Sequence, residues 1–123
     1  MKENNIILAK TFTFGLRIIK LHLYLKKQNI DRALSLQLLK SGTSVGANAE
    51  EAMGGSSKKD FKQKLRINYR EARETRYWLR LLKESQLLEQ NLADSIIQDC
   101  EEILRILTSI LNSTSDKRLI TNY

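Results

Sequence analysis

Basic side chains with a helical spacing are the feature of this sequence that best fits a chemical role. Between Ser57 and Lys83 the chain carries ten lysine or arginine residues and three acidic residues. The rest of the chain contains equal numbers of basic and acidic residues, so this segment accounts for the whole formal net charge of +7. A local excess of positive charge favours a polyanionic partner. The alternative is a solvated basic face that only keeps the protein in solution.

Six of these basic side chains share one side of a helical wheel. At about 100° per residue they fall within an arc of about 80°. They are Lys59, Lys62, Arg66, Arg70, Arg73 and Arg80. Such a stripe can follow nucleic-acid phosphates, and each contact adds to a salt-sensitive affinity. Tyr69 and Tyr77 lie on or beside the stripe, where they could stack on unpaired bases. We therefore predict nucleic-acid binding with little sequence preference.

Residue types used in catalysis and metal binding are sparse and lack the required spacing. His22 is the single histidine and no glutamate lies three residues before it, so the Glu-x-x-His pairs of di-metal bundles are missing. We expect His22 to lie partly exposed on the surface. Cys100 is the single cysteine, has no recognisable His or Asp partner, and is predicted to be a core residue. Without a phosphate loop, zinc knuckle or catalytic triad, we expect no enzyme activity, metal or cofactor.

Three further polar residues are predicted to be structural, namely Asn48, Glu51 and Glu74. Glu71 and Glu74 lie near the apolar side of their predicted helix, and Asn48 lies within the apolar stripe of another. Buried carboxylates need hydrogen-bond partners. We expect Asn48, Glu51 and Glu74 to form a hydrogen-bond network that fixes helix register or a subunit contact.

Four amphipathic segments must position these side chains. Apolar residues recur with helical spacing in residues 5–27, 31–53, 58–84 and 92–112. In the last of these segments the residues expected to point inward are Ile96, Cys100, Ile103, Leu104, Leu107 and Leu111. The stripe of the first segment is Leu8, Phe12, Leu16, Ile19 and Leu23. Further apolar residues, Ile7, Phe14, Ile18, Leu21 and Leu25, widen this face. A helix with so many apolar residues is expected to contact more than one neighbour.

Glycine residues mark a close contact and a turn. Gly42 and Gly46 lie four residues apart beside the apolar stripe of the second segment. Because glycine inside a helix costs about 1 kcal/mol relative to alanine, we interpret Gly42 and Gly46 as a close-packing surface. Gly54 and Gly55 are predicted to end this helix and form the turn. Asp31 is a good N-cap for the second segment, and Ser56 or Ser57 caps the third.

The segments predict one all-α domain, residues 1–123, folded as an antiparallel up-down-up-down four-helix bundle. The absence of proline agrees with long unbroken helices. Residues 113–123 are polar and expected to be frayed. No apolar run is long enough to span a membrane, and the N-terminus lacks the pattern of a signal peptide. A single cysteine favours a reducing cytoplasm.

The stretch SVGANAEEAMGGSSKKDFKQKLRINYREARETRYWLRLL resembles a family of small bacterial four-helix-bundle proteins, some of them encoded within intervening sequences of 23S rRNA genes. The residues that occupy positions of the family pattern are Ser44, Val45, Asn48, Ala49, Glu51, Ala52, Ser57, Asp60, Phe61 and Glu74. Ala52 replaces the usual glycine, and Glu71 stands where serine is common. The stretch RYWLRLL is also similar to the related accessory protein of diversity-generating retroelements.

The resemblance implies a homo-oligomer, most often a pentameric ring, that binds nucleic acid, with RNA expected in preference to DNA. Self-association is also expected from the first two segments, whose apolar and small residues are more than one thin bundle can hide. Two alternatives stay open. The chain could be a protein–protein adaptor whose basic face docks an acidic partner, or a purely structural oligomer.

Overall fold

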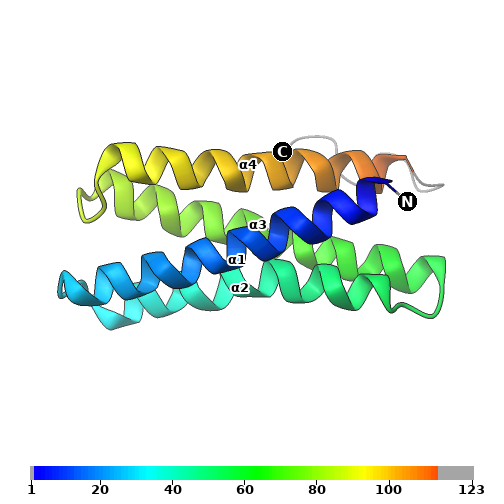
Figure 1. The fold of residues 1–123 in the computed structure, drawn as a ribbon, viewed down its shortest axis with the longest axis horizontal. Coiled ribbons are helices and arrows are strands. Elements are labelled where there is room, and N and C mark those ends of the chain that lie inside the picture. The colour runs from blue at the N-terminus through cyan, green and yellow to red at the C-terminus, as the bar shows by residue number, and fades with distance from the viewer. Residues whose placement is uncertain (1, 114–123) are drawn as a thin grey trace.

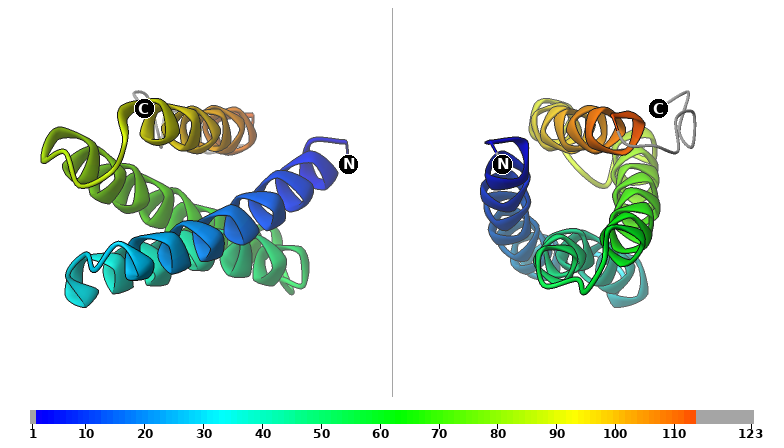
Figure 2. Two further views of the ribbon diagram at one scale, coloured as in Figure 1. Left: turned by 60° about the vertical axis from the view of Figure 1, so that its left-hand side comes forward. Right: turned by 90° about the vertical axis from the view of Figure 1, so that its right-hand side faces the viewer.

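The computed structural model describes residues 2–113, which form four helices joined by short turns (Figure 1). The helices are α1 (Lys2–Lys27), α2 (Arg32–Met53), α3 (Lys58–Glu84) and α4 (Gln90–Asn112). Each helix packs against the next in the chain, and α1 closes the bundle against α4 (Figure 2). The predicted all-α, up-down four-helix bundle is therefore confirmed. Within residues 2–113, no helix combines the length and apolar character needed to cross a bilayer.

The helix bounds differ from the predicted ones mainly at two N-terminal ends. The helix α1 begins at Lys2 rather than at residue 5, and α4 begins at Gln90 rather than at residue 92. Glu89 explains the second difference, because its carboxylate accepts a hydrogen bond from the Leu92 backbone N–H at 2.8 Å. Of the predicted frayed tail, 113–123, only Ser113 lies among the described residues, where it caps α4.

Local side-chain hydrogen bonds fix where α2 and α3 begin. Asp31 accepts a hydrogen bond from the Ala33 backbone N–H at 2.8 Å, as the sequence predicts for an N-cap. Ser57 accepts one from the Asp60 N–H at 3.0 Å, while the Asp60 carboxylate accepts one from the Ser56 N–H at 3.2 Å. This pair resembles a capping box, but the returning bond goes to Ser56, the residue before the N-cap. These hydrogen bonds fix the residue at which α3 begins, and therefore the side of the helix on which its basic residues lie.

The core takes one face from each helix. In α4 the apolar residues predicted to point inward are all buried: Ile96, Cys100, Ile103, Leu104, Leu107 and Leu111. In α1 the buried apolar residues are Ile7, Phe14, Ile18, Leu21 and Leu25. The stripe predicted for α1 lies instead on the outside, where Phe12 is 64% exposed and Leu23 is 52% exposed. We call Leu8, Phe12, Leu16, Ile19 and Leu23 the α1 outer stripe.

The apolar residues of α1 form two separate stripes with the same period, not the single widened face that was predicted. On a wheel of about 100° per residue the centres of the two stripes lie about 150° apart. Periodicity shows that a helix has an apolar face, but it cannot choose between two such faces. Contact with α2 makes the choice, since Ile18 lies against Gly42 and the Thr11 backbone lies against Gly46.

The closest approach of α1 and α2 occurs at two glycines. A Cβ atom at Gly42 would lie 2.7 Å from Cγ2 of Ile18, well inside van der Waals contact. A Cβ atom at Gly46 would lie 3.2 Å from the carbonyl oxygen of Thr11, which belongs to helical backbone and cannot turn aside. Both glycines therefore lie at a close contact between two helices, as predicted from the sequence.

Replacing Gly46 by leucine is expected to destabilise the bundle. The side chain has to push the α1 backbone away from α2, and overpacking of this kind costs about 1 to 3 kcal/mol. Thermal unfolding followed by circular dichroism measures the effect. Gln37→Leu is the control, because Gln37 is an exposed residue of the same helix. An unchanged melting temperature for Gly46→Leu would show that α1 and α2 are not held together at this point.

Candidate nucleic-acid interface

The outward side of α3 is basic over most of its length. Lys59, Arg70, Arg73 and Arg80 are exposed, and Arg66 is half-buried. At 1.5 Å per residue, the helix rises roughly 30 Å between the first and the last of these residues. We call these five residues the α3 basic face. Its length is sufficient to contact several phosphate groups along one strand.

Lys62 does not belong to this face. Its side chain is only 3% exposed, so the predicted contact of Lys62 with phosphate is wrong. Lys62 lies at the edge of the predicted arc, next to the side of α3 that faces the core. The aliphatic stem of a lysine at such a position can pack along apolar surface. Arg80 has the same angle on the wheel but is exposed. Burial at the edge of the arc thus depends on local neighbours, which the wheel does not include.

Other basic residues of α3 are used to hold the bundle together. The ion pairs to neighbouring helices are Lys64 with Glu51 (3.0 Å), Arg76 with Glu101 (3.8 Å) and Lys83 with Asp94 (2.7 Å). In contrast, the side chains of Lys59, Arg70 and Arg80 make no hydrogen bond or ion pair within residues 2–113. The cations of α3 therefore divide into a structural set, paired within the bundle, and an outward set that is available to a ligand.

The two tyrosines proposed for base stacking have different environments. Tyr69 is only 7% exposed, and its hydroxyl accepts a hydrogen bond from Nη1 of Arg73 at 3.3 Å. The Arg73 guanidinium also lies 5.9 Å from the centroid of the Tyr69 ring. Tyr77 is 54% exposed. The prediction of stacking is therefore wrong for Tyr69, whose ring is buried, and remains open for Tyr77.

The predicted network of Asn48, Glu51 and Glu74 does not form within the chain. The Asn48 amide donates to the Ser44 carbonyl of its own helix at 2.9 Å. Glu51 is exposed and pairs with Lys64, as described above. Glu74 is exposed and accepts a hydrogen bond from Nε1 of Trp78 at 3.2 Å. The two glutamates lie outside the core because α2 and α3 turn other residues toward each other.

A different glutamate, Glu71, lies close to the boundary between α2 and α3. Partial burial raises the pKa of its carboxyl group, the charge of Glu74 raises it further, and a hydrogen bond from the Ser44 side chain opposes both effects. Since the pKa in the folded state lies above the unfolded value, ionised Glu71 disfavours folding above that pKa. This cost disappears as the pH falls. The sequence already indicated that Glu71 is the more buried of the two glutamates, because Glu71 lies nearer than Glu74 to the apolar stripe of this helix.

The buried polar residues of α2 and α3 include Ser41, Thr75 and Asn68. The Thr75 hydroxyl lies 3.0 Å from that of Ser41, and the two form a hydrogen bond across the helix contact. Asn68 is fully buried, and neither its amide nitrogen nor its amide oxygen has a hydrogen-bond partner among the described residues. Buried polar atoms without partners are destabilising, by about 1 to 3 kcal/mol for each group.

Replacing Asn68 by leucine is therefore expected to stabilise the protein, by about 1 to 2 kcal/mol. The substitution removes two unpaired polar atoms and adds apolar contacts at a site of similar size. Chemical denaturation measures the change in the free energy of unfolding. Asn68→Asp is the opposite control, since it introduces a buried charge and is expected to destabilise strongly. A loss of stability in Asn68→Leu would instead show that the amide is hydrogen-bonded, for example to an internal water molecule.

The single cysteine and the single histidine occupy structural positions. Cys100 is fully buried, and its thiol donates a hydrogen bond to the Ala72 carbonyl at 3.2 Å. Burial raises the pKa of this thiol to about 12, so that it stays protonated at neutral pH. His22 is half-buried, with Nδ1 3.3 Å from the Ser35 carbonyl oxygen. Among residues 2–113, no three His, Cys, Asp or Glu side chains gather as metal ligands would.

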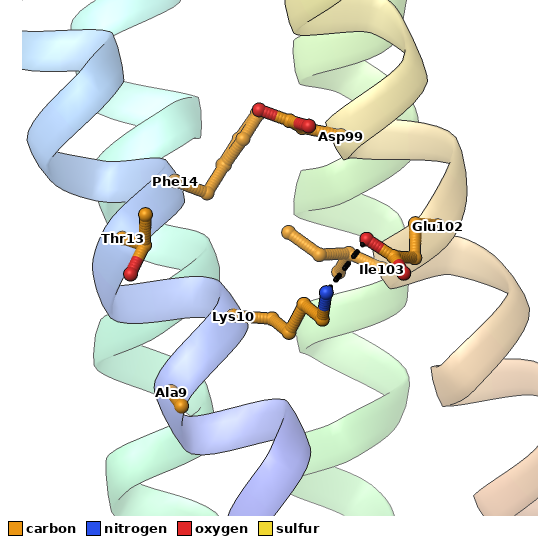
Figure 3. A pocket seen from close by; sticks show the side chains of 7 residues that line it. All are labelled: Ala9, Lys10, Thr13, Phe14, Asp99, Glu102 and Ile103. Atoms are coloured by element: carbon orange, nitrogen blue, oxygen red, sulfur yellow. Dashed lines mark ion pairs between the residues drawn. The ribbon is translucent and has the colours of Figure 1, made fainter.

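A cleft of about 300 Å³ lies between α1 and α4 (Figure 3). Lys10 reaches across it from α1 and pairs with Glu102 of α4 at 3.0 Å. Nearby, Arg17 pairs with Asp99 at 2.7 Å and donates to the Ser95 hydroxyl at 2.8 Å. The charges at this cleft therefore neutralise each other. Their role is to hold α1 against α4, from which α1 diverges toward its C-terminal end (Figures 1 and 2).

An apolar groove of about 280 Å³ runs along the other side of α1. The α1 outer stripe forms one wall, from Leu8 to Ile19, and α2 supplies the opposite wall from Thr43 to Glu50. Gly15 also lines this groove, and a Cβ atom at this position would have no neighbour within 4 Å. The groove is therefore open to a partner, and it lies on a helix other than the one that carries the α3 basic face.

Comparison with known proteins places these features in a family. A family model described as 23S rRNA-intervening sequence protein matches residues 3–109. The chain belongs to this family. The matched residues include both the α3 basic face and the α1 outer stripe, so neither surface lies in an appended segment. The match to the 23S rRNA-intervening sequence protein family also confirms the resemblance found in the sequence.

A solved structure supports the same assignment. It is the crystal structure of a protein of unknown function from the S23 ribosomal protein family of Bacteroides thetaiotaomicron. The two chains are 38% identical and superpose with a TM-score of 0.87, over 89% of this chain and 98% of the other. Comparison with curated proteins gives no match. The bundle is thus shared with an experimental structure of its family over nearly its whole length.

Proposed function

We propose that this chain is a non-enzymatic, homo-oligomeric helical bundle that binds nucleic acid through the α3 basic face. The observation that carries the proposal is the row of exposed cations at Lys59, Arg70, Arg73 and Arg80. Cations aligned over roughly 30 Å can contact several phosphates at once. The family resemblance makes RNA the expected ligand in preference to DNA.

Self-association is the second part of the proposal. Monomeric proteins rarely expose a large contiguous apolar patch, yet four residues of the α1 outer stripe are more than 40% exposed: Phe12, Leu16, Ile19 and Leu23. A second copy of the chain that covers this stripe would remove it from water. The family resemblance makes a pentameric ring the expected assembly. In a ring the α3 basic face is repeated on every subunit, so that modest affinity at one site is multiplied by avidity.

A cytoplasmic location is part of the same proposal. The chain has one cysteine, Cys100, and its thiol is buried and protonated. A protein without disulfide-forming cysteines is typical of a reducing compartment, which is also where ribosomal RNA is found.

A mobility-shift or filter-binding assay with purified RNA tests the binding. At about 50 mM salt we expect a complex. With four phosphate contacts for each subunit, raising the salt to about 200 mM should weaken binding roughly 50-fold. No complex with any RNA or DNA at low salt, by a protein shown to be oligomeric, would contradict the proposal. A pull-down that captures an acidic protein, insensitive to nuclease, would then support the adaptor function.

A further inference from the structure

Two apolar side chains lie exposed among the cations of α3. Tyr77 is 54% exposed and Leu81 is 41% exposed. Tyr77 follows Arg73 by four residues and precedes Arg80 by three, so all three lie on one side of the helix. Guanidinium groups alone are sufficient to contact phosphate. An aromatic ring placed between them therefore suits a ligand that has both negative charge and a flat apolar surface.

The ring of Tyr77 is in contact with the neighbouring Trp78. Trp78 packs edge-on against it, with 5.5 Å between the ring centroids and 66° between the ring planes. Trp78 is itself packed against the core, and its indole N–H donates to Glu74. This support restricts the motion of the Tyr77 ring before any ligand arrives. Less conformational freedom is then lost on binding, which favours affinity.

Duplex and single-stranded nucleic acids differ in what they can offer to such a site. In a duplex the faces of the bases are stacked on one another, and a convex helix surface meets mainly phosphate and sugar. In a single strand the base faces are free to stack on aromatic side chains, while a basic groove or face follows the backbone. The ring of Tyr77 and the side chain of Leu81 can pack against the face of a base only in the second case.

We infer that Tyr77 is a stacking platform for an unpaired base and that the α3 basic face therefore takes single-stranded nucleic acid or unpaired loops rather than duplex. The guanidinium groups of Arg73 and Arg80 hold the phosphates on either side of the stacked nucleotide. This inference rests on the proposed nucleic-acid function and specifies its ligand class. Any unpaired base suits the site, because every base has an aromatic face.

The test compares binding of two probes, an oligouridine of about 15 nucleotides and an RNA duplex of equal length, a size within the range that single modules occupy. Tyr77→Ala is expected to weaken binding of the single strand roughly 5- to 100-fold, the effect of losing one base–aromatic stack. Binding of the duplex should change less than about twofold. Tyr77→Phe should behave as the unmodified protein, because it keeps the ring and loses only the hydroxyl.

Trp78 provides a direct signal from the same site. It is the single tryptophan of the chain and lies in contact with Tyr77. Its fluorescence should change when the single strand is added and stay constant when the duplex is added at saturating concentration. Tyr24→Ala is the matched control for the variants, since Tyr24 is an exposed tyrosine (42%) on α1, away from the basic face.

The possible outcomes separate this inference from the proposed function. If the unmodified protein binds neither probe, the nucleic-acid function itself fails. If it binds both probes and Tyr77→Phe loses as much affinity as Tyr77→Ala, the hydroxyl contacts phosphate and the stacking inference is overturned. It is also overturned if Tyr77→Ala leaves binding of the single strand unchanged but alters the mass of the oligomer, because Tyr77 and Leu81 then form a protein contact.

Discussion

Reversing three charges of the α3 basic face, with Arg70→Glu, Arg73→Glu and Arg80→Glu combined, is expected to abolish nucleic-acid binding. Each substitution removes a phosphate contact and adds a repulsive charge, so we expect affinity at about 50 mM salt to fall by at least about 100-fold. The three side chains are exposed, and the folded bundle should keep its helical circular dichroism. The corresponding glutamine variant, which removes the contacts without repulsion, should show an intermediate loss.

The matched control changes the net charge equally at another place. Lys26→Glu, Lys27→Glu and Arg32→Glu combined alter three exposed cations at the turn between α1 and α2. If net charge alone governs binding, both triple variants lose affinity to the same extent, and the assignment of binding to α3 fails. Preserved binding in the control, with loss in the α3 variant, locates the interface on that helix.

Leu16→Asp combined with Ile19→Asp is expected to convert the assembly into folded monomers of 14.2 kDa. Both side chains are more than 40% exposed on the isolated bundle, so the substitutions should cost the monomer little stability. At a subunit contact they bury two unpaired carboxylates, and the effective penalty is several kcal/mol for each ion. Light scattering or sedimentation at micromolar concentration measures the mass of the particles.

Two further variants make this test specific. Tyr24→Asp introduces the same charge on α1 at a residue that is 42% exposed but lies off the outer stripe, and the oligomer should persist. Gly15→Leu adds no clash within the chain, because a Cβ atom at Gly15 has no neighbour within 4 Å, yet it should weaken the assembly. A monomeric unmodified protein would contradict self-association. An oligomer that persists both in the Leu16→Asp, Ile19→Asp double variant and in Gly15→Leu would place the subunit contact on another surface.

The helices and their ends followed from local sequence. Apolar residues at intervals of three and four marked all four helices, and Asp31 and Ser57 capped helices where short polar residues were expected to do so. The inward face of α4 was also predicted, since this helix has a single apolar stripe. The structure places both Gly42 and Gly46 against α1, where a Cβ atom would meet close neighbours. In each case the prediction depended only on the sequence of one helix or of two helices adjacent in the chain.

The errors arose where a side chain had more than one possible environment. The apolar residues of α1 have the same period on two faces, and periodicity alone does not distinguish the buried face from the exposed one. Lys62 and Arg80 share an angle on the wheel, but only Arg80 is exposed. Glu74 was expected in a buried network and instead holds Trp78 at the surface, next to the ring of Tyr77. Whether each of these side chains is buried depends on which residues of the other helices contact it. The sequence pattern of a single helix does not contain this information.

The sequence by itself determined that this chain forms four helices, that they pack in antiparallel order, and that the excess positive charge belongs to α3. These properties depend on local hydrogen bonding, on apolar periodicity and on the short turns, all of which act over neighbouring residues. Only the tertiary structure decided which apolar face of α1 is buried and which cations of α3 remain available to a ligand. The reason is that burial is a property of pairs of helices in contact. Glycines on α2 admit Ile18 and the Thr11 backbone of α1, and by doing so they turn Phe12, Leu16 and Ile19 toward the outside.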